Sequence, residues 1–298
     1  MIGTSWSANG SCSNLPELIK GIETGALLHI TDVDLVGCGL TEVPVEVTRL
    51  AKLEKLDLGE NDLSSLPPTF SNLVSLRILF FLNNKFESIP QVLAGLPRLE
   101  TVSFKGNALV DIPEDCLPSS LLSLIITGNH LERLPEGLGD VTPRLRKLMA
   151  SNNRLRSLPA SITRCKDLEL LRLANNQLPS LPGGLLTLPS LAWVALGGNP
   201  LLPSAPSSGP REIPLDALKL GKKLGQGASG TVFRCDVGRD YARGYGSELA
   251  CKVFHPAATI SDGSPEDELV VAAAVHHPAL QRLVGVVSHL PPEALPPP

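Results

Sequence analysis

The chain has 298 residues, of which 43% are apolar and 19% are charged, and its formal net charge is −4 at pH 7. This length predicts about two domains, and this composition is that of a folded protein rather than a disordered one. The small negative charge argues against nucleic-acid binding, which requires a basic surface. The 27 prolines and 26 glycines predict an architecture with many turns.

The N-terminal residues carry no secretion signal. Residues 1–20, MIGTSWSANGSCSNLPELIK, lack a basic head followed by an apolar run. No later stretch has the 18 consecutive apolar residues of a membrane span. We therefore expect a cytoplasmic protein with reduced thiols and no bound metal, because its six cysteines contain no C-x-x-C pair. These cysteines are Cys12, Cys38, Cys116, Cys165, Cys235 and Cys251.

Most of the chain repeats the pattern L-x-x-L-x-L-x-x-N-x-L-x-x-L-P. In the coil around Leu56 and Leu58, the alternation of apolar residues predicts a short strand with one buried face and an outward-pointing Asp57. A buried asparagine after each strand would satisfy backbone groups at the turn, so the asparagines should form a ladder. This position recurs every 22 to 24 residues, at Cys38, Asn61, Asn84, Asn107, Asn129, Asn153, Asn176 and Asn199.

This pattern resembles the leucine-rich-repeat family, in the form with a Leu-Pro or Ile-Pro pair after the turn, such as Leu66-Pro67 and Ile89-Pro90. The resemblance implies an α/β solenoid of about eight repeats over residues 27–203, with a short amphipathic cap within residues 1–26. Each coil needs its neighbours to bury its apolar face. Cys116 and Cys165 fall at apolar positions and are expected in the core.

The outward-facing strand positions are the predicted partner surface, because the strands should line a concave sheet. The early coils place Asp32, Asp34 and Asp57 there, whereas later coils place apolar and aromatic residues. Such residues are typical of the cores of protein interfaces, although scattered surface hydrophobes without function are the alternative. The predicted docking residues, for a protein partner or for another part of the chain, are Ile78, Phe80, Leu82, Ile125, Met149, Leu170 and Trp193.

Residues 204–217 are expected to form a linker. The stretch PSAPSSGPREIPLDAL, residues 203–218, is rich in proline and serine and has no apolar span. Plant receptor kinases connect leucine-rich repeats to a kinase through a transmembrane helix, and the repeats of those kinases carry a different Gly-x-Ile-Pro variant. We therefore expect both parts of this chain to lie in one compartment.

A glycine-rich loop, LGQGASG at residues 224–230, follows the linker. The alternating residues TVFRCDV after it predict a strand, so the loop should join two strands of a hairpin rather than the strand and helix of a dinucleotide site. Glycines let backbone N–H groups approach phosphate oxygens. The sequence ELACKVF then predicts a third strand that carries Lys252, and Ser264 and Pro265 predict the start of a helix.

This order of elements resembles the small lobe of protein kinases. Gly225, Gly227, Gly230 and Val232 match the family's G-x-G-x-x-G-x-V, and residues 249–252, LACK, match its V-A-I-K strand. The resemblance implies a partial kinase N-lobe over residues 218–298, with a twisted antiparallel sheet, an αC helix and a site for ATP with Mg²⁺. The implied ATP-binding residues are Leu224, Gly225, Gln226, Gly227, Ala228, Ser229, Gly230, Val232, Ala250 and Lys252.

Two residues receive catalytic roles from this resemblance. Lys252 would contact the α- and β-phosphates, and Glu268 would hold the lysine in place. The alternatives are a solvated strand lysine and an acid that favours a helix N-terminus, with Glu266 as a second candidate for the glutamate.

The sequence contains neither H-R-D-x-x-x-x-N nor D-F-G, so the family's catalytic base and Mg²⁺ ligands are absent. We therefore expect no phosphoryl transfer by this chain as given. One explanation is a fragment of a longer leucine-rich-repeat protein kinase, with serine/threonine specificity expected. The other is a protein-interaction scaffold with a vestigial lobe. We favour the first, because a lobe that lacks a fifth strand would expose a strand edge and apolar surface.

Overall fold

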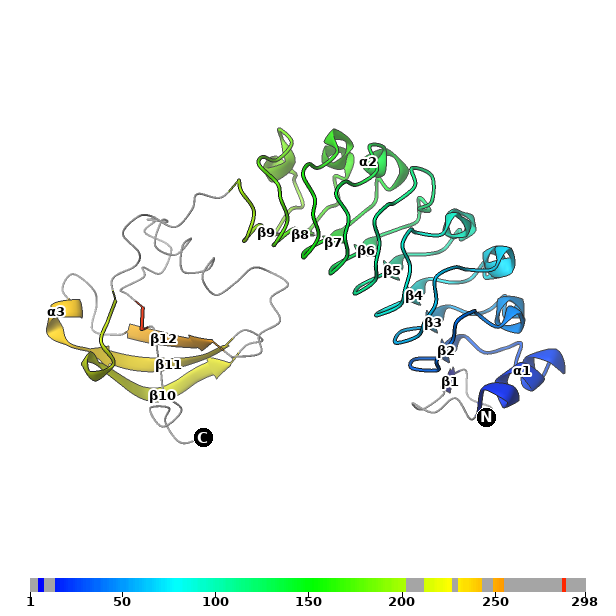
Figure 1. The fold of residues 1–298 in the computed structure, drawn as a ribbon, viewed down its shortest axis with the longest axis horizontal. Coiled ribbons are helices and arrows are strands. Elements are labelled where there is room, and N and C mark those ends of the chain that lie inside the picture. Colours follow the sequence, from blue (N-terminus) through cyan, green and yellow to red (C-terminus); the bar gives the residue numbers. More distant parts are fainter. Residues whose placement is uncertain are drawn as a thin grey trace. The chain divides into compact units, whose positions relative to one another are not determined.

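The computed structural model describes residues 5–7, 14–201, 212–226, 230–242, 249–254 and 286–287. The chain divides into two compact units, Met1–Leu201 and Leu202–Pro298 (Figure 1). Each unit has its own sheet, and the two are described separately below.

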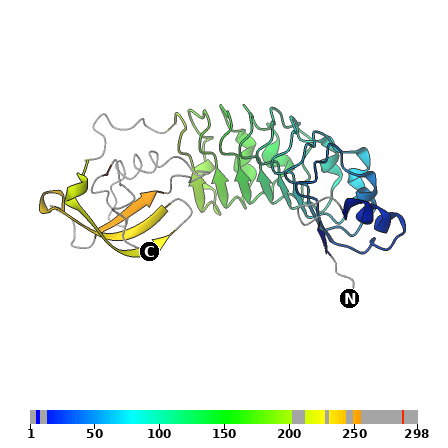
Figure 2. The same cartoon turned by 60° about the horizontal axis from the view of Figure 1, so that its bottom comes forward.

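The first unit is a solenoid around a nine-stranded parallel sheet, in which the strands follow one another in chain order. Each strand is three residues long and pairs with the next in register, so equivalent residues of successive coils are neighbours. Figure 2 shows the strands side by side along one face of the unit. The strands are β1 (Ser5–Ser7), β2 (Asp32–Asp34), β3 (Lys55–Asp57), β4 (Ile78–Phe80), β5 (Thr101–Ser103), β6 (Ser123–Ile125), β7 (Lys147–Met149), β8 (Leu170–Arg172) and β9 (Trp193–Ala195).

The opposite side of the solenoid consists of short helical turns (Figure 1). Four of these turns are preceded by the proline of the Leu-Pro or Ile-Pro pair or of Val43-Pro44, which leaves the chain extended just before the turn begins. The helical elements are α1 (Leu15–Glu23), η2 (Val45–Arg49), η3 (Pro68–Asn72), η4 (Gln91–Gly95), α2 (Leu138–Val141), η5 (Ala160–Arg164) and η6 (Leu185–Thr187).

The space between the sheet and the helical turns is filled by the repeating leucines. Leu56, Leu79 and Leu124, the central residues of their strands, are fully buried. In the third and fourth coils the leucines give way to phenylalanines, and the ring centroids of Phe81 and Phe104 lie 4.9 Å apart. Burial of about 25 cal/mol per Å² of apolar surface makes this continuous core the main stabilising feature of the unit.

The predicted asparagine ladder is confirmed: Asn61, Asn84, Asn107, Asn129, Asn153, Asn176 and Asn199 are all buried. Asn129 illustrates the bonding. Its Nδ2 donates to the carbonyl oxygens of Phe104 in the preceding coil and Ile126 in its own coil, both at 2.9 Å, and its Oδ1 accepts from the N–H of Leu109 at 2.9 Å.

Three features of the first unit differ from the expectations or extend them. The cap contains helix α1, which buries Leu18 and Ile22 and so confirms its amphipathic character. Strand β1 precedes the helix and raises the number of strands from the expected eight to nine. The expectation of reduced thiols is wrong for Cys38, which is disulfide-bonded at the one ladder position that lacks an asparagine.

Two further cysteines of this unit behave as expected. Cys116 and Cys165 are free and buried among the core residues, and burial raises the pKa of their thiols to about 12 and about 11. They are therefore protonated and unreactive near neutral pH. Cys12 lies outside the described residues.

The second unit contains a three-stranded antiparallel sheet of β10 (Leu218–Gln226), β11 (Gly230–Val237) and β12 (Leu249–Phe254), in that order. The hairpin β10–β11 and the third strand with Lys252 agree with the sequence prediction. A single turn η7 (Leu215–Ala217) precedes the sheet, and a short helix α3 (Arg239–Ala242), which was not predicted, follows β11. The predicted helix that contains Glu266 and Glu268 lies outside the described residues.

Candidate functional site

The sheet face of the solenoid holds the predicted docking residues. Ile78 and Phe80 are the first and last residues of β4, with the buried Leu79 between them, and Leu82 follows the strand. Ile125 and Met149 are the last residues of β6 and β7, like Phe80 of β4. Leu170 and Trp193 are the first residues of β8 and β9, like Ile78. Trp193 is the most accessible of these residues, with 53% of its surface exposed, and the others are half-buried.

The structure divides these residues into groups rather than joining them in one patch. Phe80 lies beside Ser103 of β5, and Ile78 lies beside Thr101. The polar strand β5 therefore separates the β4 residues from the next apolar pair, Ile125 beside Met149. Leu170 beside Trp193 forms a further pair at the end of the sheet.

The first coils give this face an acidic end. Asp34, Asp57 and Phe80 are neighbours in one row across β2, β3 and β4. Burial raises the pKa of Asp57, and the Asp34 carboxylate adds to this effect, whereas a hydrogen bond from the N–H of Gly59 and the charge of Lys55 oppose it. The carboxylates thus stand directly next to the first apolar group, a contrast that a partner can recognise.

In the second unit three of the predicted ATP-binding residues, Val232, Ala250 and Lys252, share one face of the sheet. Val232 lies directly opposite Lys252, and Arg234 lies opposite Ala250. Since side chains alternate along a strand, Val232, Ala250 and Lys252 point to the same side. The other side carries Phe233 and Cys235, both buried. The predicted residues therefore lie on the more exposed face of this sheet, as a ligand site requires.

The lysine of this face is near an aromatic ring. The Nζ of Lys252 lies 4.7 Å from the ring centroid of Phe254, a cation–π distance. The side chain is partly exposed. This position is compatible with the phosphate contact that the kinase resemblance implies, and also with a partly solvated lysine that has no ligand.

Gly230 and Gly225 of the loop differ in how closely other atoms pack against them. A Cβ on Gly230 would stand 2.5 Å from the carbonyl oxygen of Val253, so the close approach of β11 to β12 requires a glycine there. A Cβ on Gly225 would meet no atom within 4 Å, so packing does not explain this glycine. Gly227, Ala228 and Ser229 lie outside the described residues, whereas Leu224 and Gln226 are exposed residues of β10.

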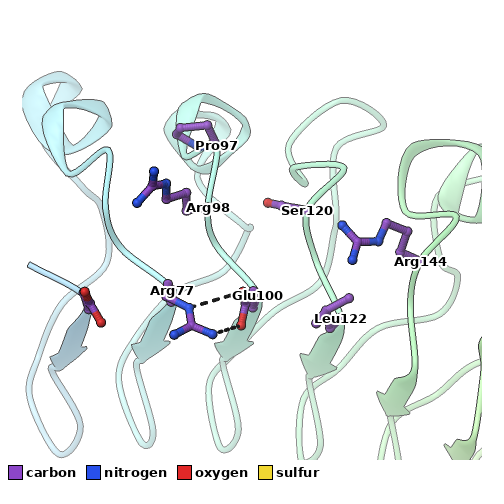
Figure 3. Close-up of a pocket in the computed structure, with 8 residues that line it drawn as sticks. Arg77, Pro97, Arg98, Glu100, Ser120, Leu122 and Arg144 are labelled. Carbon is purple, nitrogen blue, oxygen red and sulfur yellow. Dashed lines mark hydrogen bonds and ion pairs between the residues drawn. The ribbon is translucent and has the colours of Figure 1, made fainter.

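Sequence reasoning missed a recess of about 460 Å³ on the side of the solenoid, near the starts of the strands (Figure 3). Arg77 in this recess forms a bidentate ion pair with Glu100 of the next coil, with 2.8 Å between Nη2 and Oε2. The recess is lined by Glu54, Arg77, Pro97, Arg98, Glu100, Ser120, Leu122 and Arg144. An alignment of successive coils could have found it, because these residues fall at only a few positions of the repeat.

Within the part of the chain that the structure describes, there is no group of three or more His, Cys, Asp or Glu side chains that could hold a metal ion. None of the described helices has the length and apolar character needed to cross a membrane.

Comparison with protein families identifies the repeats. The family model described as leucine rich repeat matches residues 52–109 and 143–201. A comparison with curated proteins gives no match. The matched ranges lie in the first unit and contain six of the seven ladder asparagines, all but Asn129, in agreement with the bonding pattern described above.

Several solved structures are similar to part of the chain. A leucine-rich-repeat protein of Leptospira interrogans is 28% identical with a TM-score of 0.56, over 60% of this chain and 45% of that one. The ectodomain of the plant membrane receptor kinase GASSHO1/SCHENGEN3 from Arabidopsis thaliana, in complex with CASPARIAN STRIP INTEGRITY FACTOR 2, is 28% identical with a TM-score of 0.51, over 65% of this chain and 23% of that one.

The Toll–Spatzle complex of Drosophila is also similar, at 23% identity and a TM-score of 0.51, over 59% of this chain and 25% of that one, and supports the fold alone. This chain spans less than half the length of each of these three proteins. The ladder, the parallel sheet and the family match agree on one conclusion: the first unit of this chain is a solenoid of leucine-rich repeats.

Proposed function

We propose that this chain is a protein-interaction scaffold whose leucine-rich repeats bind a protein partner on the sheet face. The observation that carries the proposal is the row of partly exposed apolar side chains on β4 and β6 to β9, where an isolated solenoid would be expected to place polar residues. One of the similar solved structures, the GASSHO1/SCHENGEN3 ectodomain, is a complex with CASPARIAN STRIP INTEGRITY FACTOR 2, which supports a binding role for repeats of this kind.

The grouping of these residues favours an extended partner that touches several coils. Neighbouring parallel strands are about 4.8 Å apart, so β4 and β9 are separated by roughly 24 Å along the sheet. Aromatic side chains dominate binding energy when a partner covers them. Phe80 near one end of the row and Trp193 at the other are therefore the expected anchors.

The proposal predicts that Phe80→Asp and Trp193→Asp weaken partner binding about tenfold or more each, because both remove an aromatic anchor and bring a carboxylate into the contact. Peptides selected from a random displayed library on the wild-type protein serve as the probe, and their affinity for each variant is measured by biolayer interferometry. Val45→Asp is the matched control, since Val45 is also 53% exposed but lies on η2, away from the sheet. Selected peptides that bind all three variants equally would contradict the proposal.

We propose as a second candidate that the sheet of the second unit binds ATP, as part of a protein-kinase N-lobe of serine/threonine type. The shared face of Val232, Ala250 and Lys252 and the absence of a packing reason for Gly225 favour this candidate. In it, backbone N–H groups of the glycine loop approach the phosphates, Lys252 neutralises their charge, and Glu268 orients the lysine. Mg²⁺ would accompany the nucleotide, and a kinase reaction would need a catalytic base and Mg²⁺ ligands that this sequence does not contain.

This second candidate predicts that Mg-ATP raises the thermal unfolding midpoint of the second unit and that Lys252→Met abolishes the rise. A ligand at about five times its Kd stabilises a protein by about 1 kcal/mol, so millimolar nucleotide should suffice for a weak site. Differential scanning calorimetry with and without Mg-ATP gives the shift. Lys219→Met, which removes an exposed lysine of β10, should keep it. An equal shift in the wild type and in Lys252→Met would assign the effect to another part of the chain.

A further inference from the structure

The recess on the side of the solenoid interrupts a regular ladder of charges. The residue just before each strand begins is charged in most coils, in the order Glu54, Arg77, Glu100, Leu122, Arg146 and Glu169. Adjacent coils are joined there by backbone bonds, such as that from the N–H of Glu100 to the carbonyl oxygen of Arg77 at 2.9 Å. Side chains of opposite charge therefore stand about 4.8 Å apart.

The charges of this ladder are paired on both sides of Leu122. Arg77 binds Glu100 through two hydrogen bonds, and Arg146 binds Glu169 with 2.9 Å between Nε and Oε1. The hydrogen bonds to Glu100 and then the charge of that carboxylate raise the pKa of the Arg77 guanidinium, and the charge of Glu54 adds to this effect. Arg77 is thus compensated within the protein, and Leu122 leaves the middle of the ladder without a charge.

Two more arginines line the recess, one in the coil on either side of this gap. Arg98 and Arg144 precede their strands by a few residues and flank Ser120 of the coil between them, and both are exposed. Figure 3 shows Arg144 extending toward the Ser120 coil and Arg98 extending toward the coil of Arg77, without a marked bond from either. The Ser120 hydroxyl donates to the carbonyl oxygen of Leu99 at 2.9 Å, so it offers no proton to the recess.

The carboxylates of the recess do not compensate these two arginines. Glu100 is bound to Arg77, and Glu54 contributes to the charge environment of that same arginine. The lining contains three arginines and two glutamates, which leaves an excess of one positive charge around the uncharged Ser120 and Leu122. An arrangement of this kind attracts negatively charged partners and excludes positively charged ones.

We propose that this recess binds an acidic, extended segment of a partner protein, whose two carboxylates pair with Arg98 and Arg144 and complete the interrupted charge ladder. The backbones that carry the two arginines lie two strand spacings apart, or about 10 Å, and their flexible side chains reach into the recess from both sides. Residues i and i+3 of a polyproline II segment lie on one side at about 9.3 Å, which matches that spacing. The segment therefore carries acidic residues three positions apart, with small or apolar residues over Leu122. This surface is separate from the apolar residues of the sheet face.

The test uses the full chain and fluorescein-labelled peptides of twelve residues that contain Pro, Ser and Gly with two Glu three positions apart. Fluorescence anisotropy is expected to show binding that weakens as NaCl is raised and that is lost when both Glu are replaced by Gln. Arg98→Gln and Arg144→Gln should each weaken binding about three- to fivefold, the range for exposed charge pairs. Arg133→Gln, which removes an exposed arginine outside the recess, should change it less than twofold.

Several other outcomes of the peptide-binding experiment would support or overturn the proposal. Equal binding of the Glu and Gln peptides, or equal effects of Arg98→Gln and Arg133→Gln, would overturn the proposal. Peptides with adjacent Glu that bind as well as the spaced pair would overturn the two-point geometry. Inorganic phosphate that displaces the Glu peptide only at the concentration at which NaCl does so supports a polypeptide ligand, whereas specific displacement at lower concentration contradicts it. Phe80→Asp should leave this peptide binding unchanged. A failure of the recess proposal can therefore be distinguished from a failure of the sheet-face proposal.

Discussion

At the scale of single residues, the buried asparagine decides the geometry of each coil. Asn129 donates to carbonyl oxygens of two coils and accepts an N–H from a third segment, all within 2.9 Å. No apolar residue can replace these bonds, because the backbone groups of the turn would then be buried without partners. The same position in the first coil holds Cys38, which is disulfide-bonded.

This role predicts a large cost for Asn129→Ala. The variant removes the side-chain partner of two backbone groups, the carbonyl of Phe104 and the N–H of Leu109, whereas the carbonyl of Ile126 still accepts from Asn153 Nδ2. Each orphaned group costs about 1–3 kcal/mol, so the loss of stability should be about 2–4 kcal/mol after partial relaxation. Urea unfolding followed by circular dichroism measures the change. Asn72→Ala removes an exposed asparagine of η3 and should alter the free energy of unfolding by less than about 0.5 kcal/mol. Similar losses in both variants would show that the ladder contributes little.

At the scale of elements, the sequence predicts the strands that follow from repeated leucine spacing or from alternating apolar and polar residues. The strands of the solenoid follow from leucine spacing, and the hairpin β10–β11 with its third strand β12 follows from alternation around a glycine loop. Strand β1 was not predicted, because Ser5–Ser7 has no leucine pattern; it pairs in register with β2, and the Ser7 hydroxyl donates to the Asp34 carboxylate. The family resemblance supplied the concave placement of the docking residues, but the polar interruption at β5 emerges only when the register of β4, β5 and β6 is known.

The recess shows the limit of prediction from local patterns most clearly. Arg98 and Arg144 are 46 residues apart in the sequence and have no shared motif. They lie close together because each coil advances by only one strand spacing, so the residue between them in space, Ser120, is about midway between them in the chain. Likewise, the disulfide at Cys38 was missed because cysteine spacing alone does not say which thiols meet.

At the scale of the whole molecule, the two units have separate cores and separate aromatic reporters. Both tryptophans, Trp6 and Trp193, lie in the first unit, whereas both tyrosines, Tyr241 and Tyr245, lie in the second. In a solenoid each coil contacts only its neighbours, so stability is a sum over coils and their interfaces, and damage in a central coil affects the stack on both sides. Tryptophan fluorescence therefore reports on the unfolding of the repeats, because the second unit contains no tryptophan.

This separation predicts different effects of core substitutions in the two units. Leu124→Ala removes a fully buried side chain from the central strand β6 and should destabilise the solenoid by about 3 kcal/mol. The urea midpoint seen by tryptophan fluorescence should then fall by about 1–1.5 M, given a dependence of about 2–3 kcal/mol per M. Phe233→Ala removes a buried side chain of β11 and should leave this midpoint unchanged. If Phe233→Ala lowered the tryptophan midpoint as much as Leu124→Ala does, the two units would have to unfold as one cooperative structure, and a substitution in the second unit could then not be interpreted independently of the repeats.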